Sequence, residues 1–175
     1  MVFRPASKND ACAIAALHAK SWQQNYRGAL SDAFLDEKAP SERLAVWRSR
    51  LENSPSEQCV LVAENGGKVV GFVCLYFDHS SEYGTLLDNL HVSSEMQGNG
   101  IGRQLMRLAA EKMERRRPDS SMYLWVLQQN LAAIRFYEAL GGLKVEAVEE
   151  MDIGDIPVIK SRYYWNSLSP LLQIE

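Results

Sequence analysis

Apolar residues recur at two different spacings along the chain, and each spacing predicts a kind of element. Alternating or continuous apolar runs, typical of β-strands, occupy residues 2–4, 59–64, 68–77, 85–92 and 121–127. Apolar residues that recur every three or four positions predict helices. One ends near 24, two begin near 31 and near 40, one runs from about 103 to 117, and one spans 130–140. A last pair of strands, 144–151 and 158–166, is predicted to form a hairpin.

Turn residues separate these segments. Asn65-Gly66-Gly67 predicts a tight hairpin, and residues 25–28 and 78–84 are polar breaks. The strand at 68–77 is nearly all apolar, so we expect it to lie inside a sheet. The sequence contains no repeat, linker or low-complexity tract. We therefore expect one domain, residues 1–175, built on a mixed α/β sheet.

The most informative stretch joins the strand at 85–92 to the helix after Gly102. Here Gly98, Gly100 and Gly102 alternate between a strand and a helix. Glycines remove β-carbons and leave backbone N–H groups free at a helix start, which is a favourable place for a phosphate. A simple chain reversal is the alternative. A dinucleotide fingerprint is excluded because Arg103 stands where its last glycine belongs, and no Gly-Lys-Ser/Thr of a P-loop occurs.

A second informative stretch is the helix at 130–140. Asn130 directly follows a strand and can cap this helix, and Tyr137 lies on the same face nearly two turns later. Two interpretations stay open. Asn130 could be only a cap and Tyr137 only a core aromatic residue, or the phenol could donate a proton to a leaving group.

Composition narrows the class of partner. The net charge is −3 and the pI is about 5.7, so the chain lacks the overall basic character of a nucleic-acid-binding protein. The longest apolar run, 69–77, is too short to cross a bilayer, and no signal peptide opens the chain. We expect a cytoplasmic protein without a membrane partner, with three small buried thiols at Cys12, Cys59 and Cys74.

Other classes of chemistry are disfavoured. The histidines His18, His79 and His91 are scattered and match no metal-binding motif, so we expect no metal. No Gly-x-Ser-x-Gly elbow occurs, and Cys74 lies within an apolar strand. Direct transfer is therefore favoured over a covalent enzyme intermediate.

The two informative stretches together resemble the signature of the GNAT superfamily of acyl-CoA-dependent N-acetyltransferases. The matching patterns are Leu90-x-Val92 followed by Gln97-x-x-Gly100-x-Gly102, and Asn130-x-x-Ala133-x-x-Phe136-Tyr137. The resemblance covers essentially the whole chain. It implies an α/β (α+β) fold with a mixed, twisted, mostly antiparallel sheet of about seven strands flanked by about four helices. The fourth and fifth strands would splay apart to admit acetyl-CoA.

The resemblance also implies roles for individual residues. Backbone groups of Leu90, His91 and Val92 would pair with the pantetheine arm, and Asn130 would bind near the thiol. Tyr137 would protonate the departing thiolate. The pyrophosphate would be held by the glycine loop, that is by Gln97, Gly98, Asn99, Gly100, Ile101, Gly102 and Arg103.

The acceptor side is less well defined. A base or a water chain must remove the proton of the amine, and the sequence does not single it out. The candidates are Asp88, which by strand alternation shares a face with Leu90, and Glu82 in the preceding turn. Trp125 stands where we align a glutamate of the ribosomal-protein acetyltransferases, which argues against that substrate class. Gly142 replaces the family's usual Phe and should affect packing. The first helices would supply the acceptor pocket through Trp22, Tyr26 and, less directly, Trp47.

These observations predict an enzyme that moves an acetyl group from acetyl-CoA directly to a primary amine of a small molecule or peptide, in a ternary complex. The alternative is a non-catalytic acyl-CoA-binding or sensor module. The identity of the amine acceptor stays open. The aromatic hairpin at 163–165 could support a homodimer or belong to the core.

Overall fold

The computed structural model describes residues 1–151 and 153–174. Seven strands form one sheet: β1 (Val2–Pro5), β2 (Gln58–Asn65), β3 (Lys68–Ser80), β4 (Gly84–Val92), β5 (Met122–Leu127), β6 (Leu143–Glu150) and β7 (Val158–Trp165). The α-helices are α1 (Ala11–Asn25), α2 (Ala39–Glu52), α3 (Ile101–Arg116), α4 (Leu131–Ala139) and the short α5 (Ser169–Leu172). Short 3₁₀ turns lie at Lys8–Asp10 and Ser94–Met96.

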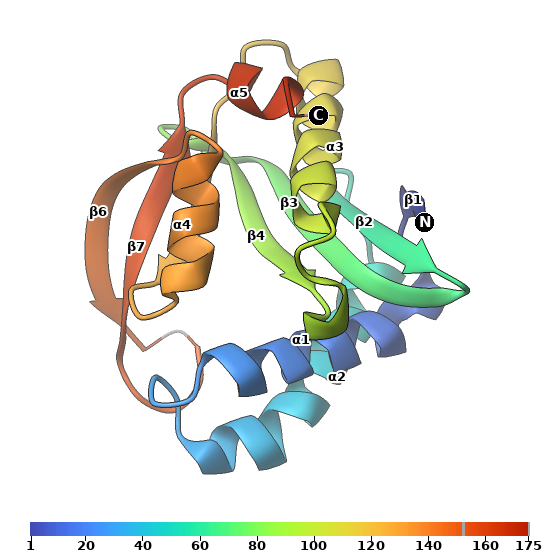
Figure 1. The fold of residues 1–175 in the computed structure, drawn as a ribbon, viewed down its shortest axis with the longest axis vertical. Helices are drawn as coiled ribbons and strands as arrows, with labels where there is room; N and C mark the ends of the chain where they lie inside the picture. The colour runs from blue at the N-terminus through green and yellow to red at the C-terminus, as the bar shows by residue number, and fades with distance from the viewer. Residues whose placement is uncertain (152, 175) are drawn as a thin grey trace.

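The sheet has the order β1-β2-β3-β4-β5-β7-β6 (Figure 1). Every neighbouring pair is antiparallel except β4 and β5, which are parallel. This mixed, mostly antiparallel sheet with its covering helices confirms the predicted fold class. The β2–β3 hairpin at Asn65-Gly66-Gly67 is confirmed as well, and Ser7 and Asp10 form a capping box before α1.

Strand alternation assigns a different set of helices to each face of the sheet. Val62 and Phe72 point to one face, where they pack with Ile14 of α1 and Trp47 of α2. Residues of the opposite parity in β2 and β3, together with β4 and β5, pack against α3. Figure 1 shows α3 in front of β3 and β4, and α4 in front of the β7 side. The parallel junction of β4 and β5 therefore lies between two helical layers.

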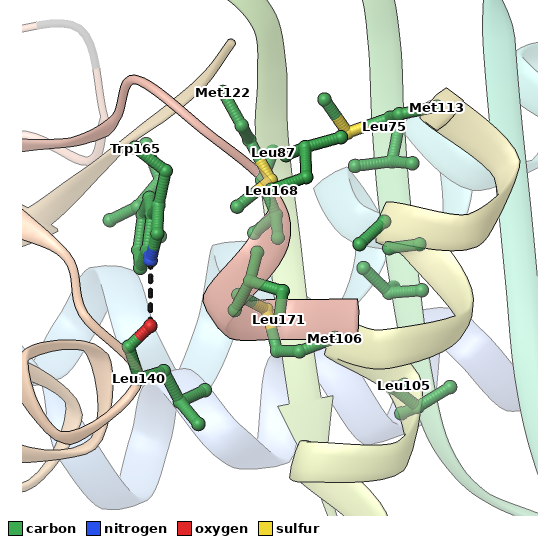
Figure 2. Close-up of a cluster of buried hydrophobic side chains, with 14 of the residues drawn as sticks. Leu75, Leu87, Leu105, Met106, Met113, Met122, Leu140, Trp165, Leu168 and Leu171 are labelled. Atoms are coloured by element: carbon green, nitrogen blue, oxygen red, sulfur yellow. Dashed lines mark hydrogen bonds between the residues drawn. The ribbon is translucent and has the colours of Figure 1, made fainter. Parts of the chain in front are cut away.

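The C-terminal segment completes the core on the α3 side. Figure 2 shows Leu168 and Leu171 packed beside Met106 of α3, and the Trp165 indole N–H donating to the Leu140 carbonyl at 2.9 Å. A β-carbon on Gly142 would approach the Trp165 ring to 2.6 Å, so a bulky side chain cannot stand there without repacking. The predicted packing role of Gly142 follows from this contact.

The aromatic hairpin divides between core and half-buried positions. Tyr163 and Trp165 are each 2% exposed, so both belong to the core, and only the half-buried Tyr164 keeps substantial accessible surface. A surface built from all three aromatic residues is therefore excluded.

Three expectations about local structure are wrong. Cys12 is exposed, because it lies on the solvent side of α1, whereas Cys74 is buried as expected. The helices predicted from about 31 and about 40 are joined, because a π-helical turn at Phe34–Lys38 runs directly into α2. Residues 78–80 belong to β3 and not to the following turn. Within the described residues, no helix combines the length and apolar character needed to cross a bilayer.

Candidate functional site

A large cavity opens where β4 and β5 separate. The two strands pair only at Thr85–Met122 and Leu86–Tyr123 among the described residues, and residues 87–92 of β4 have no partner strand on that side. The cavity between them has a volume of about 980 Å³ and is lined by both strands, the glycine loop, α4 and the ends of α1 and α2. The free backbone groups of this β4 edge can pair with an extended ligand.

The glycine loop forms one end of the cavity. Gly98 and Gly100 both have φ near +76°, a left-handed conformation that side chains disfavour, although a β-carbon at either would meet no atom within 4 Å. Glycine is required at position 102 for a different reason: a β-carbon there would lie 3.3 Å from the Phe136 ring of α4. Backbone conformation therefore fixes the first two glycines and helix packing fixes the third.

The polar side chains of this loop mainly hold its backbone. The Gln97 amide donates to the Val92 carbonyl at 3.2 Å, and the Asn99 amide donates to the Met96 and Gln97 carbonyls, also at 3.2 Å. Gly98, Gly100, Ile101, Gly102, Arg103 and Gln97 line the cavity, whereas Asn99 does not. The loop therefore offers backbone N–H groups and the positive end of α3 to an anion.

Helix α4 brings its two predicted residues to the same cavity. The Asn130 side chain caps the helix by accepting from the Ala133 N–H at 3.2 Å, and it also lines the cavity. Tyr137 is 8% exposed and lines the cavity from the same helix. Burial raises the pKa of Tyr137 well above its usual value, with a smaller contribution from Tyr26. The phenol therefore keeps its proton at neutral pH.

Tyr26 and Trp22 lie on the wall formed by α1 and α2. Both line the cavity, their rings stack with centroids 5.6 Å apart, and burial raises the pKa of Tyr26 to about 12. Trp22 is only 4% exposed, and the Arg43 guanidinium lies 4.4 Å from its ring centroid. Arg43 therefore covers the indole and presents the polar surface at this point. Trp47 is fully buried and does not line the cavity.

His91 joins β4 to this wall. Its Nδ1 lies 2.8 Å from the Ser21 hydroxyl, and its ring contacts the His18 ring with centroids 4.5 Å apart. Burial, assisted by the charge of Arg43, lowers the pKa of His91 to about 4. His18 is completely buried, and burial lowers its pKa well below the usual value; its Nδ1 accepts from the Trp47 indole at 3.0 Å. Histidines that are distant in sequence thus form a neutral pair whose rings lie in contact at an angle of 35°.

The two predicted bases lie in different places. Asp88 lines the cavity and bonds Arg50 of α2 at 2.7 Å, while Glu82 is exposed in the β3–β4 turn and does not line it. The expectation that Asp88 shares a face with Leu90 is wrong. A β-bulge places Leu87 opposite Leu75 and Asn89 opposite Cys74, so Asp88 is the extra residue. Its carboxylate turns with the Asn89 amide towards Arg50, which bonds both.

The sequence did not predict a role in the cavity for several residues that line it. His79 Nδ1 lies 2.6 Å from the Tyr123 hydroxyl near the point where β4 and β5 separate. Lys160 of β7 lies 5.1 Å from the Trp125 ring centroid, and its Nζ is 2.7 Å from Glu150. These groups come from strands and helices far apart in the sequence, and no local motif marks them. Among the described residues, no group of three or more His, Cys, Asp or Glu side chains is arranged to bind a metal ion.

Comparisons with known proteins agree with this architecture. The family model described as "Acetyltransferase (GNAT) family" matches residues 17–142. An uncharacterised N-acetyltransferase of Bacillus subtilis is 30% identical over 171 residues, which cover 96% of this chain and 94% of the relative.

Solved structures show the same fold. PaiA N-acetyltransferase from Thermoplasma acidophilum, in complex with coenzyme A, aligns with a TM-score of 0.66 and 22% identity over 91% of this chain and 96% of that one. The yncA protein of Salmonella typhimurium, solved with its cofactor acetyl-CoA, aligns with a TM-score of 0.65 and 23% identity over 94% and 92%.

Proposed function

Because the chain belongs to the acetyltransferase (GNAT) family and is an acetyl-CoA-dependent acetyltransferase, we propose that it transfers the acetyl group directly to a primary amine of a small molecule or peptide. The observation that carries this proposal is the cavity between β4 and β5, which brings the glycine loop, Asn130 and Tyr137 to one space. The amine would enter from the α1–α2 wall, and both substrates would be bound together.

The residues on one side of the cavity fit acetyl-CoA, which supplies an activated thioester when bound. The unpaired backbone of Leu90, His91 and Val92 offers the hydrogen bonds of a missing strand to the pantetheine arm. The N–H groups from Gly98 to Arg103 lie at the start of α3, where a pyrophosphate is favoured. We call these residues, with Asn130 and Tyr137, the cofactor half of the cavity.

Tyr137 is the proposed acid. The amine nitrogen forms a bond to the acetyl carbon, the carbon–sulfur bond breaks, and the sulfur takes the phenolic proton. Burial raises the pKa of this phenol, so the proton stays on the oxygen until the thiolate forms beside it; the same burial makes a thiolate in this site more basic than it is in water, which allows it to take that proton. No side-chain nucleophile is required.

The opposite side, which we call the acceptor half, consists of the α1–α2 wall with Asp88 of β4 and Trp125 of β5. The amine must lose a proton before or during attack. Asp88 is the better placed of the two predicted bases, since it lines the cavity and Glu82 does not. The His79–Tyr123 pair offers a second hydrogen-bonded route for that proton.

The experiment that tests the function measures free thiol when the protein and acetyl-CoA are mixed with single amines from a panel of polyamines, aminoglycosides, amino acids and peptides. We expect stoichiometric thiol release and N-acetylated product, by mass spectrometry, with at least one class. Tight coenzyme A binding with no release on any amine would contradict the enzyme proposal and favour the acyl-CoA sensor.

A further inference from the structure

The acceptor half contains a guanidinium for which the cavity supplies no carboxylate. The described residues that line the cavity include four long basic side chains, Arg43, Arg50, Arg103 and Lys160. Arg50 is paired with Asp88 and Lys160 with Glu150, each at 2.7 Å, and both of those carboxylates also line the cavity. Arg103 is exposed and belongs to the glycine loop. Of these four residues, Arg43 is therefore the one that has neither a carboxylate partner in the cavity lining nor a place in the cofactor half.

Arg43 is held in place mostly by packing. Its side chain is 14% exposed and its guanidinium lies over the Trp22 ring. One nitrogen, Nη2, donates to Glu42 at 2.5 Å, but the Glu42 side chain is 45% exposed and does not line the cavity. Arg43 Nε is buried and has no hydrogen-bond partner in the described part of the chain. A buried donor without a partner is costly, so packing and not Nε hydrogen bonding holds the side chain, and a ligand in the cavity would meet the terminal nitrogens of the guanidinium.

The one carboxylate that Arg43 contacts among the described residues, Glu42, lies outside the cavity lining. The nearby His91 and His18 rings are held in the neutral form by burial, and the charge of Arg43 itself contributes to this effect. An imidazole in that state supplies no negative charge. The α1–α2 wall therefore presents the Arg43 guanidinium to a cavity whose β4 wall carries the Asp88 carboxylate and the Asn89 amide, both bonded to Arg50.

We propose that Arg43 binds an oxyanion of the acceptor, so that the substrate is a primary amine carrying a carboxylate or phosphonate group, as in an amino acid. This inference rests on the proposed function. The guanidinium fork matches the planar oxygens of a carboxylate. The amino end of such an acceptor would then face Asp88 on β4, so opposite charges on the wall and the strand match those of a zwitterion.

The test compares matched acceptors and matched variants. Each acceptor set has three members on one carbon skeleton: an amino acid, its aminophosphonate analogue and the amine that lacks the acidic group. The protein variants are Arg43→Met, Arg43→Lys and, as a control, Arg48→Met, because Arg48 is an exposed arginine of α2 outside the cavity. Initial rates give kcat/KM for each combination, and calorimetry gives the affinity for coenzyme A.

We expect the wild-type protein to prefer an acceptor with an oxyanion over its matched amine by at least about tenfold in kcat/KM. Arg43→Met should lower kcat/KM about 10- to 100-fold for that acceptor and less than about threefold for the amine, with Arg43→Lys between them. The carboxylate and phosphonate arms identify which oxyanion is bound. Arg48→Met should behave as wild type, and coenzyme A affinity should be unchanged throughout.

Three results would overturn the inference: equal losses for the oxyanion-bearing and plain acceptors, a wild-type preference for the plain amine, or a loss of coenzyme A binding in Arg43→Met.

A second readout separates failure of this inference from failure of the proposed function. Binding of an N-acetylated amino acid and of the matching N-acetylated amine to the coenzyme A complex is measured by calorimetry, without turnover. Tighter, Arg43-dependent binding of the first supports the oxyanion site even if no amine is acetylated, and equal binding contradicts it.

Discussion

The two halves of the cavity differ in which atoms line them: mainly backbone atoms in the cofactor half and side chains in the acceptor half. The cofactor half consists mainly of backbone: an unpaired strand edge, two glycines with left-handed φ and the start of α3. The acceptor half consists of side chains from α1, α2, β4 and β5, which include aromatic rings and the Arg50–Asp88 ion pair. On the proposed assignment, backbone interactions recognise what all acyl-CoA molecules share, whereas side chains distinguish one amine from another. The comparison therefore predicts that cofactor and acceptor specificity can be changed separately.

The largest expected effect is a loss of coenzyme A affinity, caused by a change in the cofactor half alone. Gly100→Val should weaken coenzyme A binding by about 100-fold or more, because a β-branched residue cannot keep φ near +76° and the start of α3 must move. Isothermal titration calorimetry measures this loss.

Gly67→Val is the matched control for this change, since Gly67 has φ of +77° in the β2–β3 turn, away from the cavity. It carries the same backbone strain and should leave the affinity within about twofold of wild type. Equal losses in the two variants would mean that destabilisation, and not the loop, explains the effect.

A second change separates chemistry from cofactor binding. Tyr137→Phe should reduce kcat about 100-fold, the usual contribution of a positioned acid, while coenzyme A affinity stays within about twofold. Pre-steady-state rates of thiol formation measure the effect. Tyr164→Phe is the control, because that hydroxyl bonds Asn166 at 3.1 Å outside the cavity. Wild-type turnover in Tyr137→Phe would remove this residue as the acid, and Tyr26→Phe would then be the variant to examine.

The smallest expected effect concerns the contact between the halves at His91. Its folded pKa of about 4 lies below the unfolded value, so the unfolded state binds more protons as the pH falls and stability is lost. Between pH 7 and pH 5 the free energy of unfolding should fall about 2 kcal/mol more in the wild type than in His91→Gln. Urea denaturation at both pH values measures the difference. The same loss in both proteins would show that His91 titrates normally.

More of the residues proposed for the cofactor half than of those proposed for the acceptor half could be singled out from the sequence, for a physical reason. Conformational demands at Gly98 and Gly100 and the cap at Asn130 are local, so they appear as residue types at fixed spacing. Arg43 could not be distinguished from other charged residues of α2, such as Arg48, because only tertiary packing makes one half-buried and the other exposed.

Strand alternation failed at one position for a similar reason. The bulge at Asp88 is not marked by glycine or proline, so simple parity placed this carboxylate on the wrong face. The contact of His18 with His91 also depends on a helix meeting a strand. Both features depend on long-range pairing, and they decide the shape of the acceptor half.

The most direct test of the central claim is amide hydrogen exchange with and without acetyl-CoA. If the separated edge of β4 receives the pantetheine arm and the glycine loop receives the pyrophosphate, exchange should slow in residues 87–92 and 98–103, while the β2–β3 hairpin at 65–68 stays unchanged. Saturating acetyl-CoA that leaves exchange at 87–92 and 98–103 unaltered would contradict the account.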